Sequence, residues 1–268
     1  MTNAVVTIRG TTKVFGVGAD ATHALDGIDL EIEKGAFVSL IGPSGCGKST
    51  LLRLIGDLTQ PSAGVVQVNG KSAHQARLDR DYGIVFQSPV LFDWRTVAEN
   101  VELPLEVSAI DKRTRAERAH AMLALVELSG FERRYPWQLS GGMQQRVAIA
   151  RALSFEPAIL LMDEPFGALD EMTRERLNLE LLGIWRKTGT TIVFVTHSIP
   201  EAVFLSTRVV VMSARPGRIV DVIDVDLSQP RNDLTREDPR YFSFVTRVRE
   251  SLRGRGERAP SSLRASAT

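Results

Sequence analysis

A glycine-rich loop, GPSGCGKS at residues 42–49, constrains the fold of this chain more than any other feature of its sequence. The loop follows a short apolar run, AFVSLI, and precedes STLLRLIGDL, whose apolar residues have helical spacing. It fits the pattern G-x-x-x-x-G-K-[ST], in which glycines let the backbone wrap around phosphates and the helix N-terminus attracts the anion. A strand, this loop and a helix in succession therefore predict an α/β fold that binds a nucleotide.

Individual residues of the loop suit different parts of a nucleoside triphosphate. The Lys48 ammonium is expected to reach the β- and γ-phosphates, and the Ser49 hydroxyl is expected to ligate Mg²⁺. Cys46 is interpreted as a small residue that fits the loop. The residues predicted to bind the nucleotide here are Gly42, Pro43, Ser44, Gly45, Cys46, Gly47, Lys48, Ser49 and Thr50.

The stretch ILLMDEP supplies the carboxylates that a nucleotide-hydrolysing site needs. Its four apolar residues place Asp163 and Glu164 at the C-terminal end of a strand, where α/β sheets bind ligands. Asp163 is predicted to hold Mg²⁺ through water, and Glu164 to act as general base on the attacking water. Adjacent carboxylates are usually only part of a solvated surface, but the strand and the glycine-rich loop favour the catalytic interpretation.

Composition excludes several other classes of protein. The 268 residues carry 33 Lys and Arg against 32 Asp and Glu, a net charge of +1 that gives no argument for a nucleic-acid surface. A single cysteine cannot form an internal disulfide. The start of the chain lacks the features of a signal peptide, and the longest apolar runs have the length of strands. We therefore expect a cytosolic chain, or one attached to a membrane through a partner.

The order of elements predicts an α/β domain with a helical insertion. The N-terminal third, with AVVTIRG and ALDGIDLEI, has the alternation of β-strands, whereas residues from about 97 to 155 have helical spacing. Strand-sized runs then alternate with helical segments near 171–187 and 199–206, which predicts a largely parallel sheet covered by helices. The stretch RPGRI at 215–219 is predicted to form a turn between two strands.

The C-terminal part has a different character. Phe242, Val245, Val248 and Leu252 have helical spacing, so a helix is expected within an extension at 226–253. We interpret this helix as a cover for the core; a regulatory role and a contact with a partner are the alternatives. The polar, Arg-rich residues 254–268 are expected to form a disordered tail.

A second glycine-rich loop, LSGGMQQR at 139–146, also precedes a helical segment and has the features of a phosphate site. A chain of this size is expected to bind one nucleotide, so the second loop needs an explanation. Both loops, the Asp-Glu pair and their order along the chain resemble the nucleotide-binding subunits of ATP-binding cassette (ABC) transporters. The resemblance covers residues 5–225 and rests on several separate motifs.

The resemblance implies a fold, a domain organisation and an activity. The fold is α/β: a P-loop NTPase with a RecA-like core, an N-terminal antiparallel β-subdomain and an inserted α-helical subdomain. The ABC ATPase domain is predicted at residues 1–225, with the core at 1–87 and 156–225 and the helical subdomain at 88–155. The implied activity is ATP hydrolysis, with ATP and Mg²⁺ as cofactors.

The resemblance also assigns roles to residues that are weak signals when taken singly. Gln87 in IVFQ would link Mg²⁺ and the water to the helical subdomain, and His197 in VFVTHS would contact the γ-phosphate. Asp170 in GALD would contact the opposite subunit, and Phe15 in KVFG would stack on adenine. Without the resemblance, a lone Gln means little, a His at a strand end is as often structural, and a Phe is commonly buried. The implied catalytic residues are Glu164, His197, Gln87 and Lys48, and the implied metal ligands are Ser49, Gln87 and Asp163.

The second loop then has a role in another molecule. In this family two subunits pack head to tail, so Ser140, Gly141 and Gly142 would cap the γ-phosphate held by the partner's P-loop. Gly142 and Lys48 belong to different predicted subdomains, which makes closure of both around one nucleotide within one chain implausible. The resemblance therefore implies a head-to-tail dimer with a second copy of this chain.

Because the chain has no predicted membrane span, a transport role requires separate permease subunits. The chain is then expected at the cytoplasmic face of the inner membrane, as a peripheral subunit. Leu91, Phe92 and Trp94 follow Gln87 in a region that receives a helix of the membrane subunit in this family. Packing in the local core is the alternative. An extracytoplasmic solute-binding protein is an indirect partner, and no nucleic-acid partner is expected.

The stretches around LFDWRTVAENVELPLEV and THSIPEAVFLSTRVVVMSARPGRIV are similar to the nitrate, sulfonate and taurine importer subfamily. A soluble, non-transport ABC ATPase acting on nucleic acid or the ribosome is the alternative. Such proteins usually carry two cassettes or long coiled-coil insertions, and this chain has neither.

Overall fold

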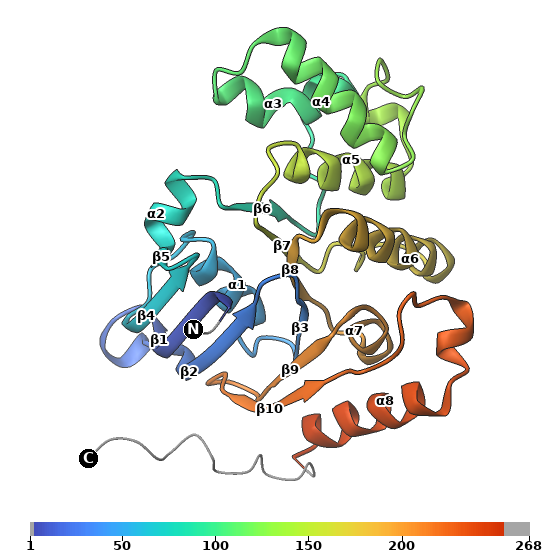
Figure 1. Cartoon of the computed structure of the whole chain (residues 1–268). Coiled ribbons are helices and arrows are strands. Elements are labelled where there is room, and N and C mark those ends of the chain that lie inside the picture. The colour runs from blue at the N-terminus through green and yellow to red at the C-terminus, as the bar shows by residue number, and fades with distance from the viewer. Residues whose placement is uncertain (1–2, 255–268) are drawn as a thin grey trace.

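The computed structural model of the chain describes residues 3–254, which form two sheets and a set of helices around them (Figure 1). The strands are β1 (Ala4–Phe15), β2 (Thr22–Glu33), β3 (Phe37–Ile41), β4 (Ala63–Val68), β5 (Lys71–Ser72), β6 (Tyr82–Val85), β7 (Ile159–Asp163), β8 (Thr191–Val195), β9 (Arg208–Met212) and β10 (Ile219–Asp224). The α-helices are α1 (Lys48–Ile55), α2 (Ala73–Leu78), α3 (Val97–Val107), α4 (Lys112–Leu125), α5 (Gly141–Leu153), α6 (Glu171–Thr188), α7 (Ile199–Leu205) and α8 (Pro239–Leu252). Short 3₁₀ helices lie at Gly18–Asp20, Pro136–Gln138 and Asp233–Arg236.

A six-stranded sheet in the order β10-β9-β3-β8-β7-β6 forms the centre of the fold. Its neighbouring strands pair in parallel from β9 to β6, and only the edge strand β10 is antiparallel. Side chains alternate between the two faces of a strand, so Val38 and Leu40 join the cluster around α1, whereas Phe37 joins the cluster on the other face. The apolar runs of β3 and β8 are fully buried because both faces of the sheet are covered.

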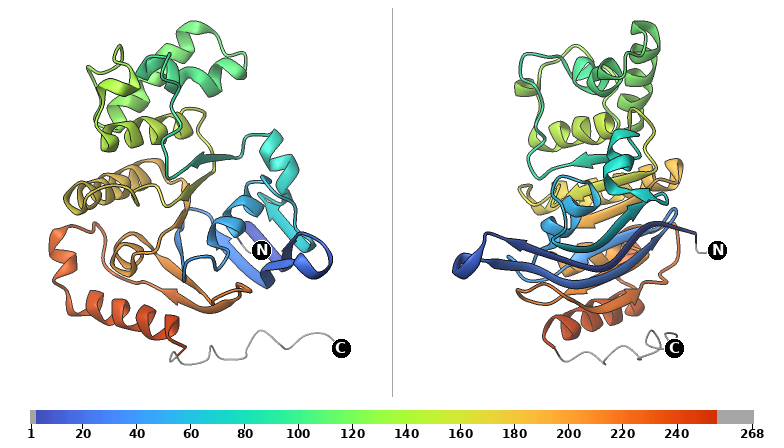
Figure 2. Two further views of the ribbon diagram at one scale, coloured as in Figure 1. Left: turned by 180° about the vertical axis from the view of Figure 1, so that it is seen from behind. Right: turned by 90° about the vertical axis from the view of Figure 1, so that its left-hand side faces the viewer.

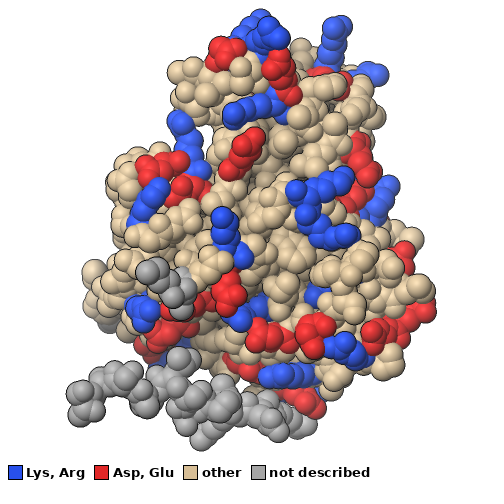
Figure 3. All heavy atoms as spheres, in the orientation of Figure 1, with Lys and Arg blue, Asp and Glu red and all other residues tan. Residues whose placement is uncertain are grey.

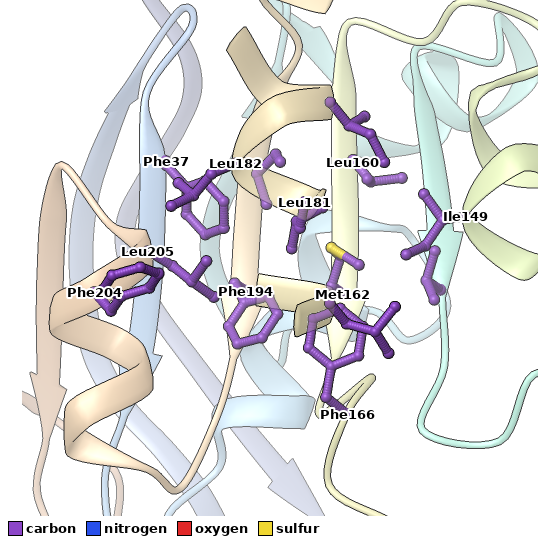
Figure 4. Close-up of a cluster of buried hydrophobic side chains, with 14 of the residues drawn as sticks. Phe37, Ile149, Leu160, Met162, Phe166, Leu181, Leu182, Phe194, Phe204 and Leu205 are labelled. Carbon is purple, nitrogen blue, oxygen red and sulfur yellow. The ribbon is translucent and has the colours of Figure 1, made fainter. Parts of the chain in front are cut away.

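The cluster on the second face packs the sheet against α5, α6, α7 and α8 (Figure 4). Phe194 of β8 lies near its centre, with ring centroids 5.9 Å from Phe37 and 6.0 Å from Phe166. Leu181 and Leu182 of α6 contribute to the same cluster. This packing fixes the strand ends from which the loops of the candidate site emerge.

The N-terminal residues form a separate antiparallel sheet in the order β2-β1-β4-β5. One view of the molecule shows its long strands beside the central sheet (Figure 2). Apolar residues of β1 and β2, such as Ile8 and Ile28, join the cluster around α1. The predicted α/β P-loop fold with an N-terminal antiparallel sheet is confirmed.

Helices α3, α4 and α5 form the region at the top of Figure 1. Helix α3 begins with a capping box, in which the Thr96 hydroxyl accepts from the Glu99 amide and the Glu99 carboxylate accepts from the Thr96 amide. All three helices lie inside the range 88–155 that was predicted as a helical subdomain, although the boundaries themselves stay a prediction.

The C-terminal extension covers the core through α8, but its apolar stripe differs from the predicted one. Val245 and Val248 are buried as expected, whereas Phe242 is 56% exposed. Tyr241 is buried instead, and its hydroxyl donates to the Pro200 carbonyl of α7 at 3.1 Å. The predicted stripe is wrong only at Phe242, since Leu252 also packs on the core, and Tyr241 is buried in its place because its polar end finds an acceptor in the core.

Arg231, in the segment before α8, is buried and holds the end of α7. Its Nη1 donates to the carbonyls of Val203, Phe204 and Ser206 at 2.8–3.1 Å. Burial lowers the pKa of Arg231 to about 10. Of the predicted tail at 254–268, residues 255–268 lie outside the described part of the chain. Within the part that the structure covers, no helix is long and apolar enough to cross a membrane.

Candidate active site

The loop between β3 and α1 owes its shape to glycines. Gly47, at the N-cap of α1, has φ +98°, and a Cβ there would lie 2.7 Å from Leu25 Cδ2 and 2.9 Å from the Ala24 carbonyl oxygen. A side chain at Gly42 would lie 2.7 Å from Cys46 Sγ. Only glycine fits both positions, so the backbone can curve tightly and bring the N-terminus of α1 to the loop.

Lys48 is held inside this loop. Its side chain is only 6% exposed, and Nζ donates to the carbonyls of Gly42 at 2.9 Å and Pro43 at 3.2 Å. Cys46 is also buried, consistent with its interpretation as a small residue that fits the loop. The ammonium therefore lies where the loop backbone curves around it, the position from which it can bind a phosphate.

The structure brings two of the three predicted metal ligands, Ser49 and Asp163, together. The Ser49 hydroxyl, in the first turn of α1, donates to Asp163 Oδ1 at 2.7 Å. Asp163 is the last residue of β7 and pairs with Val195 of β8. Because β3 and β7 are parallel strands of one sheet, their C-terminal ends meet at the same edge and place these oxygens together.

Glu164 follows in an unusual backbone conformation. Its φ of +47° lies in the left-handed region, which costs a non-glycine residue about 1–2 kcal/mol. Two backbone hydrogen bonds hold it there: the amide donates to the Val195 carbonyl, and the carbonyl accepts from the Gly167 amide, both at 3.0 Å. The side chain meets His197, whose Nδ1 lies 3.2 Å from Glu164 Oε2. Local strain at this position places the carboxylate beside the imidazole.

A cleft of about 370 Å³ opens between the P-loop and the N-terminal sheet. Phe15, at the end of β1, is 45% exposed and lines it, and Lys13 Nζ lies 4.8 Å from the centre of the Phe15 ring. The other residues that line the cleft are Thr22, Ala24, Ser44, Gly45, Gly47, Lys48, Ser49, Thr50, Glu164 and Arg215. The cleft thus joins an aromatic face, a phosphate loop and a carboxylate, which are the parts needed to bind and hydrolyse a nucleotide.

Gln87 lies near this cluster, just after the end of β6. A Cβ at Gly167, in the loop after Glu164, would be 3.4 Å from Gln87 Nε2. Gln145 of α5, which is 2% exposed, donates from Nε2 to the Phe86 carbonyl at 3.0 Å. The helix that carries the second glycine-rich loop is therefore tied to the Gln87 segment. Sequence reasoning missed Gln145, although it lies within the quoted LSGGMQQR.

The second glycine-rich loop has other neighbours. Ser140 is the N-cap of α5 and accepts from the Met143 amide. A Cβ at Gly141 would lie 3.4 Å from Leu169 Cδ2, and one at Gly142 would lie 3.0 Å from Thr173 Cγ2. None of the loop's three predicted phosphate-binding residues lines the cleft.

Asp170, the N-cap of α6, lies between Leu169 and Thr173 in the sequence, and it does not line the cleft either. Its carboxylate accepts from the Thr173 amide at 3.0 Å, and hydrogen bonds from Thr173 lower the pKa of Asp170. The structure therefore gathers Phe15, Gln87, Asp163, Glu164 and His197 around the P-loop, and places the second loop beside Asp170.

A further segment packs on the P-loop and was not expected to. The turn between β9 and β10 contains RPGRI, which had been predicted only as a connection. The Gly217 amide donates to the Ala24 carbonyl at 3.0 Å, and a Cβ at Gly217 would overlap the Cys46 carbonyl oxygen. Arg215 donates from Nε to the Gly45 carbonyl at 3.3 Å. Only the Pro-Gly turn signal was visible in the sequence, because the contact joins segments about 170 residues apart.

The fold and the site define a P-loop protein that binds and hydrolyses a nucleoside triphosphate. The family model described as ABC transporter matches residues 25–167, and the chain belongs to the ATP-binding subunits of this family. It is therefore an ATPase. The resemblance on the two loops and the Asp-Glu pair is confirmed at the level of the family.

Individual relatives agree with this assignment. The chain is 50% identical over 241 residues to an uncharacterized ABC transporter ATP-binding protein of Methanocaldococcus jannaschii, covering 90% of each chain. It is 45% identical over 227 residues to the aliphatic sulfonates import ATP-binding protein SsuB of Bacillus thuringiensis, covering 85% of this chain and 88% of the relative.

A solved structure similar to this fold is the dimeric, post-hydrolysis ATP-binding cassette MJ0796 bound to ADP and Pi. Its TM-score is 0.72 at 38% identity, covering 82% of this chain and 98% of that one. Another is cbiO1 of Clostridium perfringens, described as part of the ABC transporter complex cbiONQ, with a TM-score of 0.76 at 25% identity over 94% and 96% of the chains.

Proposed function

We propose that this chain energises the import of a small organic anion of the sulfonate type, and that two copies close head to tail around two ATP molecules. The observation that carries the closure is the division of the site. The P-loop and Glu164 line one cleft, Asp163 and His197 contact them through Ser49 and Glu164, and the residues of the LSGGMQQR loop neither line this cleft nor contact Ser49 or Glu164. The import of a sulfonate-like solute rests on similarity to the SsuB relatives, whose name states that activity.

The geometry supports a division of labour in hydrolysis. The P-loop backbone and Lys48 bind the phosphate chain, and Phe15 stacks on the adenine ring. As water attacks the γ-phosphorus in line, Glu164 accepts the proton of the water and the bond to ADP breaks. His197, 3.2 Å from Glu164, holds the carboxylate in place and donates to the γ-phosphate.

Mg²⁺ fits the donor set at the end of β7. The Ser49 hydroxyl and the Asp163 carboxylate lie 2.7 Å apart and are oxygen donors of the kind that this ion prefers, with the Gln87 amide as a further ligand. Within residues 3–254 no group of three or more His, Cys, Asp and Glu side chains could hold a metal. Mg²⁺ is expected to bind through few protein ligands and the phosphates, where it neutralises charge on the leaving group.

Mixing two inactive variants tests the head-to-tail dimer. Lys48→Ala removes the phosphate ligand of the P-loop. Ser140→Arg fills the space in front of the LSGGMQQR loop. Each variant alone should lose ATPase activity. A mixed dimer contains one intact site, made of Lys48 from one chain and Ser140 from the other, so an equimolar mixture should recover up to about a quarter of wild-type ATPase activity.

The matched control is a mixture of Lys48→Ala with the double variant that carries both Lys48→Ala and Ser140→Arg. No chain of this mixture supplies Lys48, so no activity should return. Activity that stays absent in the first mixture as well, although Ser140→Arg still binds ATP, would show that the LSGGMQQR loop serves the P-loop of its own chain.

The segment after Gln87 is proposed to dock the permease subunits at the cytoplasmic face of the membrane. Trp94 is 74% exposed and contacts Phe92, with ring centroids 4.8 Å apart. The buried Asn100 fixes this loop, because its side chain accepts from the Phe92 amide at 2.8 Å and donates to the Phe92 carbonyl at 3.1 Å. A rigid loop that presents an exposed aromatic pair suits a protein interface.

Charge substitution tests the docking surface. Trp94→Glu should abolish co-purification with the permease and reduce uptake, while ATP affinity stays within twofold of wild type. Leu78→Glu is the control, since Leu78 is 56% exposed on α2, in another part of the fold. Normal assembly and uptake by Trp94→Glu would remove the segment from the interface. The solute itself is tested by screening sulfonates on the cognate extracytoplasmic binding protein.

A nucleic-acid partner is not favoured. The net charge is +1, and the face seen in Figure 3 intersperses Lys and Arg with Asp and Glu rather than gathering them into one basic patch.

A further inference from the structure

The turn between β9 and β10 lies against the phosphate loop. Strand β9 is parallel to β3, so both strands end at the same edge of the sheet, and the P-loop and this turn are neighbours there. Gly217 is hydrogen bonded on both sides to β2: its amide donates to Ala24 and its carbonyl accepts from Asp26, both at 3.0 Å. The turn is therefore fixed between β2 and the P-loop, and its side chains have defined positions relative to the cleft.

The two arginines of this turn have different surroundings. Arg218 forms an ion pair with Asp26, with its Nε 3.0 Å from Asp26 Oδ2. Arg215 makes no ion pair with a carboxylate of the described chain, and its one hydrogen bond to the protein runs from Nε to the Gly45 carbonyl. A guanidinium has five N–H donors, so most of those of Arg215 remain available to a ligand.

Arg215 is also one of the lining residues of the cleft. Among the described residues that line it, Lys48 and Arg215 are the two cations, and they contact different residues of the loop. Lys48 is enclosed by the carbonyls of Gly42 and Pro43, whereas Arg215 is exposed and contacts Gly45 from the turn. A second cation at the phosphate loop suits a polyanionic ligand, and the planar guanidinium can form two parallel hydrogen bonds to phosphate oxygens.

We propose that Arg215 is a nucleotide-binding residue that donates to the phosphate chain of ATP and ADP while its Nε fixes the Gly45 peptide of the P-loop. This proposal rests on the proposed function, because it takes the cleft to be the ATP site. The role differs from that of Lys48, which lies inside the loop. Arg215 belongs to a turn that the sequence places far from the P-loop, and it adds a contact from the C-terminal side of the domain.

Equilibrium binding to the full-length protein tests the proposal, with Mg-ATP, Mg-ADP, AMP and adenosine as ligands. Arg215→Ala should weaken ATP and ADP binding about tenfold or more, the effect expected from losing charge-assisted hydrogen bonds, and should change adenosine binding less than twofold. Arg215→Lys, which keeps the charge but not the paired donors, should lie between Arg215→Ala and wild type. Arg218→Ala, in the same turn, should bind all four ligands as wild type does.

Two further results separate this proposal from the one it depends on. Wild-type ATP affinity in Arg215→Ala, together with lost binding in Lys48→Ala, would overturn the role of Arg215 and leave the site intact. Unchanged ATP binding in Lys48→Ala would instead overturn the site. An equal loss of adenosine and ATP affinity in Arg215→Ala would show a contact with the nucleoside and also contradict the phosphate role. Since Arg215 is exposed, its truncation should leave the melting temperature unchanged, and this measurement accompanies each titration.

Discussion

Two helices of this molecule begin at glycine-rich loops, and their surroundings differ. The N-terminus of α1 is enclosed by its own chain: Lys48 is buried, Ser49 donates to Asp163, and Phe15 lines the cleft in front. The N-terminus of α5 has an exposed Ser140 and Gly141 and lies beside Leu169 of the loop before α6. Both helices present an N-terminus preceded by glycines, but only the N-terminus of α1 opens onto the nucleotide cleft of its own chain.

The difference supports the proposal that two copies of the chain form the functional unit. A helix N-terminus with nothing opposite it offers hydrogen-bond donors to a ligand that another molecule must bring. In the proposed head-to-tail dimer, the P-loop cleft of a second copy of this chain would bring such a ligand. Asp170 accepts from the Thr173 amide, and a Cβ at Gly142 would lie 3.0 Å from Thr173 Cγ2, so Asp170 and the start of α5 would reach the partner together. The predictions below test how far the two regions act separately.

The largest effect is expected at Glu164. Glu164→Gln keeps the shape of the side chain but removes the base, so the hydrolysis rate should fall about 100-fold or more while ATP binding persists. Because hydrolysis no longer removes the γ-phosphate, ATP should hold the variant as a dimer that size-exclusion chromatography detects. Undiminished ATPase activity would show that another group accepts the proton. A variant that hydrolyses nothing and stays monomeric with ATP would contradict the link between the two regions.

Much of the fold and of the first region was predictable from the sequence. The P-loop, the strand end at Asp163 and the helix beginning at Lys48 are local patterns, and the structure places them as predicted. Contacts between distant segments were not predictable from local patterns. Gly217 packs on Cys46, Gln145 holds the Phe86 carbonyl, and Arg231 caps α7, each joining parts of the chain that no local pattern connects. The strained backbone of Glu164 was also invisible, since glutamate carries no signal for a left-handed conformation.

The second largest effects are expected from replacing a glycine of each loop with alanine, and these substitutions should distinguish the two loops. Gly47→Ala introduces a Cβ 2.7 Å from Leu25 at a positive φ, so it should destabilise the fold by about 1–3 kcal/mol and abolish nucleotide binding. Gly141→Ala places a Cβ in ordinary contact with Leu169, 3.4 Å away, so its stability should equal that of wild type. Its ATP affinity as a monomer should also be unchanged, but the ATPase rate of the dimer should fall about tenfold because the added methyl lies at an exposed surface that faces the partner.

Thermal unfolding, ATP titration and ATPase assays on both glycine variants measure these differences. A Gly141→Ala protein with wild-type ATPase activity would remove the backbone of α5 from the active site. If monomeric Gly141→Ala failed to bind ATP, the result would instead show that the LSGGMQQR loop takes part in ATP binding by its own chain.

The smallest effect is expected at Glu201, a buried residue of α7 that contacts the loop of His197. Thr196 Oγ1 donates to Glu201 Oε2 at 2.5 Å, and the same hydroxyl accepts from the Ser198 amide at 3.0 Å, which fixes the backbone on both sides of His197. Burial raises the pKa of Glu201 above its ordinary value of 4.5, and the hydrogen bond from Thr196 opposes this shift. Glu201 thus fixes the loop of His197 from the first turn of α7.

Glu201→Gln keeps the hydrogen bond from Thr196 and removes the charge. The folded state holds the proton more tightly than the unfolded chain, so Glu201 contributes most stability below pH 4.5 and loses it as the pH rises toward its raised pKa. The free energy of unfolding of Glu201→Gln, relative to wild type, should therefore increase from pH 4.5 upward, while the ATPase rate at pH 7 falls only about twofold. Asp170→Asn serves as the opposite control, because the pKa of Asp170 is lowered and its stabilising effect is lost as the pH falls. A pH-independent difference between Glu201→Gln and wild type would mean that burial does not raise the pKa of the Glu201 carboxyl group, and the charge of Glu201 would then play no part in fixing the loop of His197.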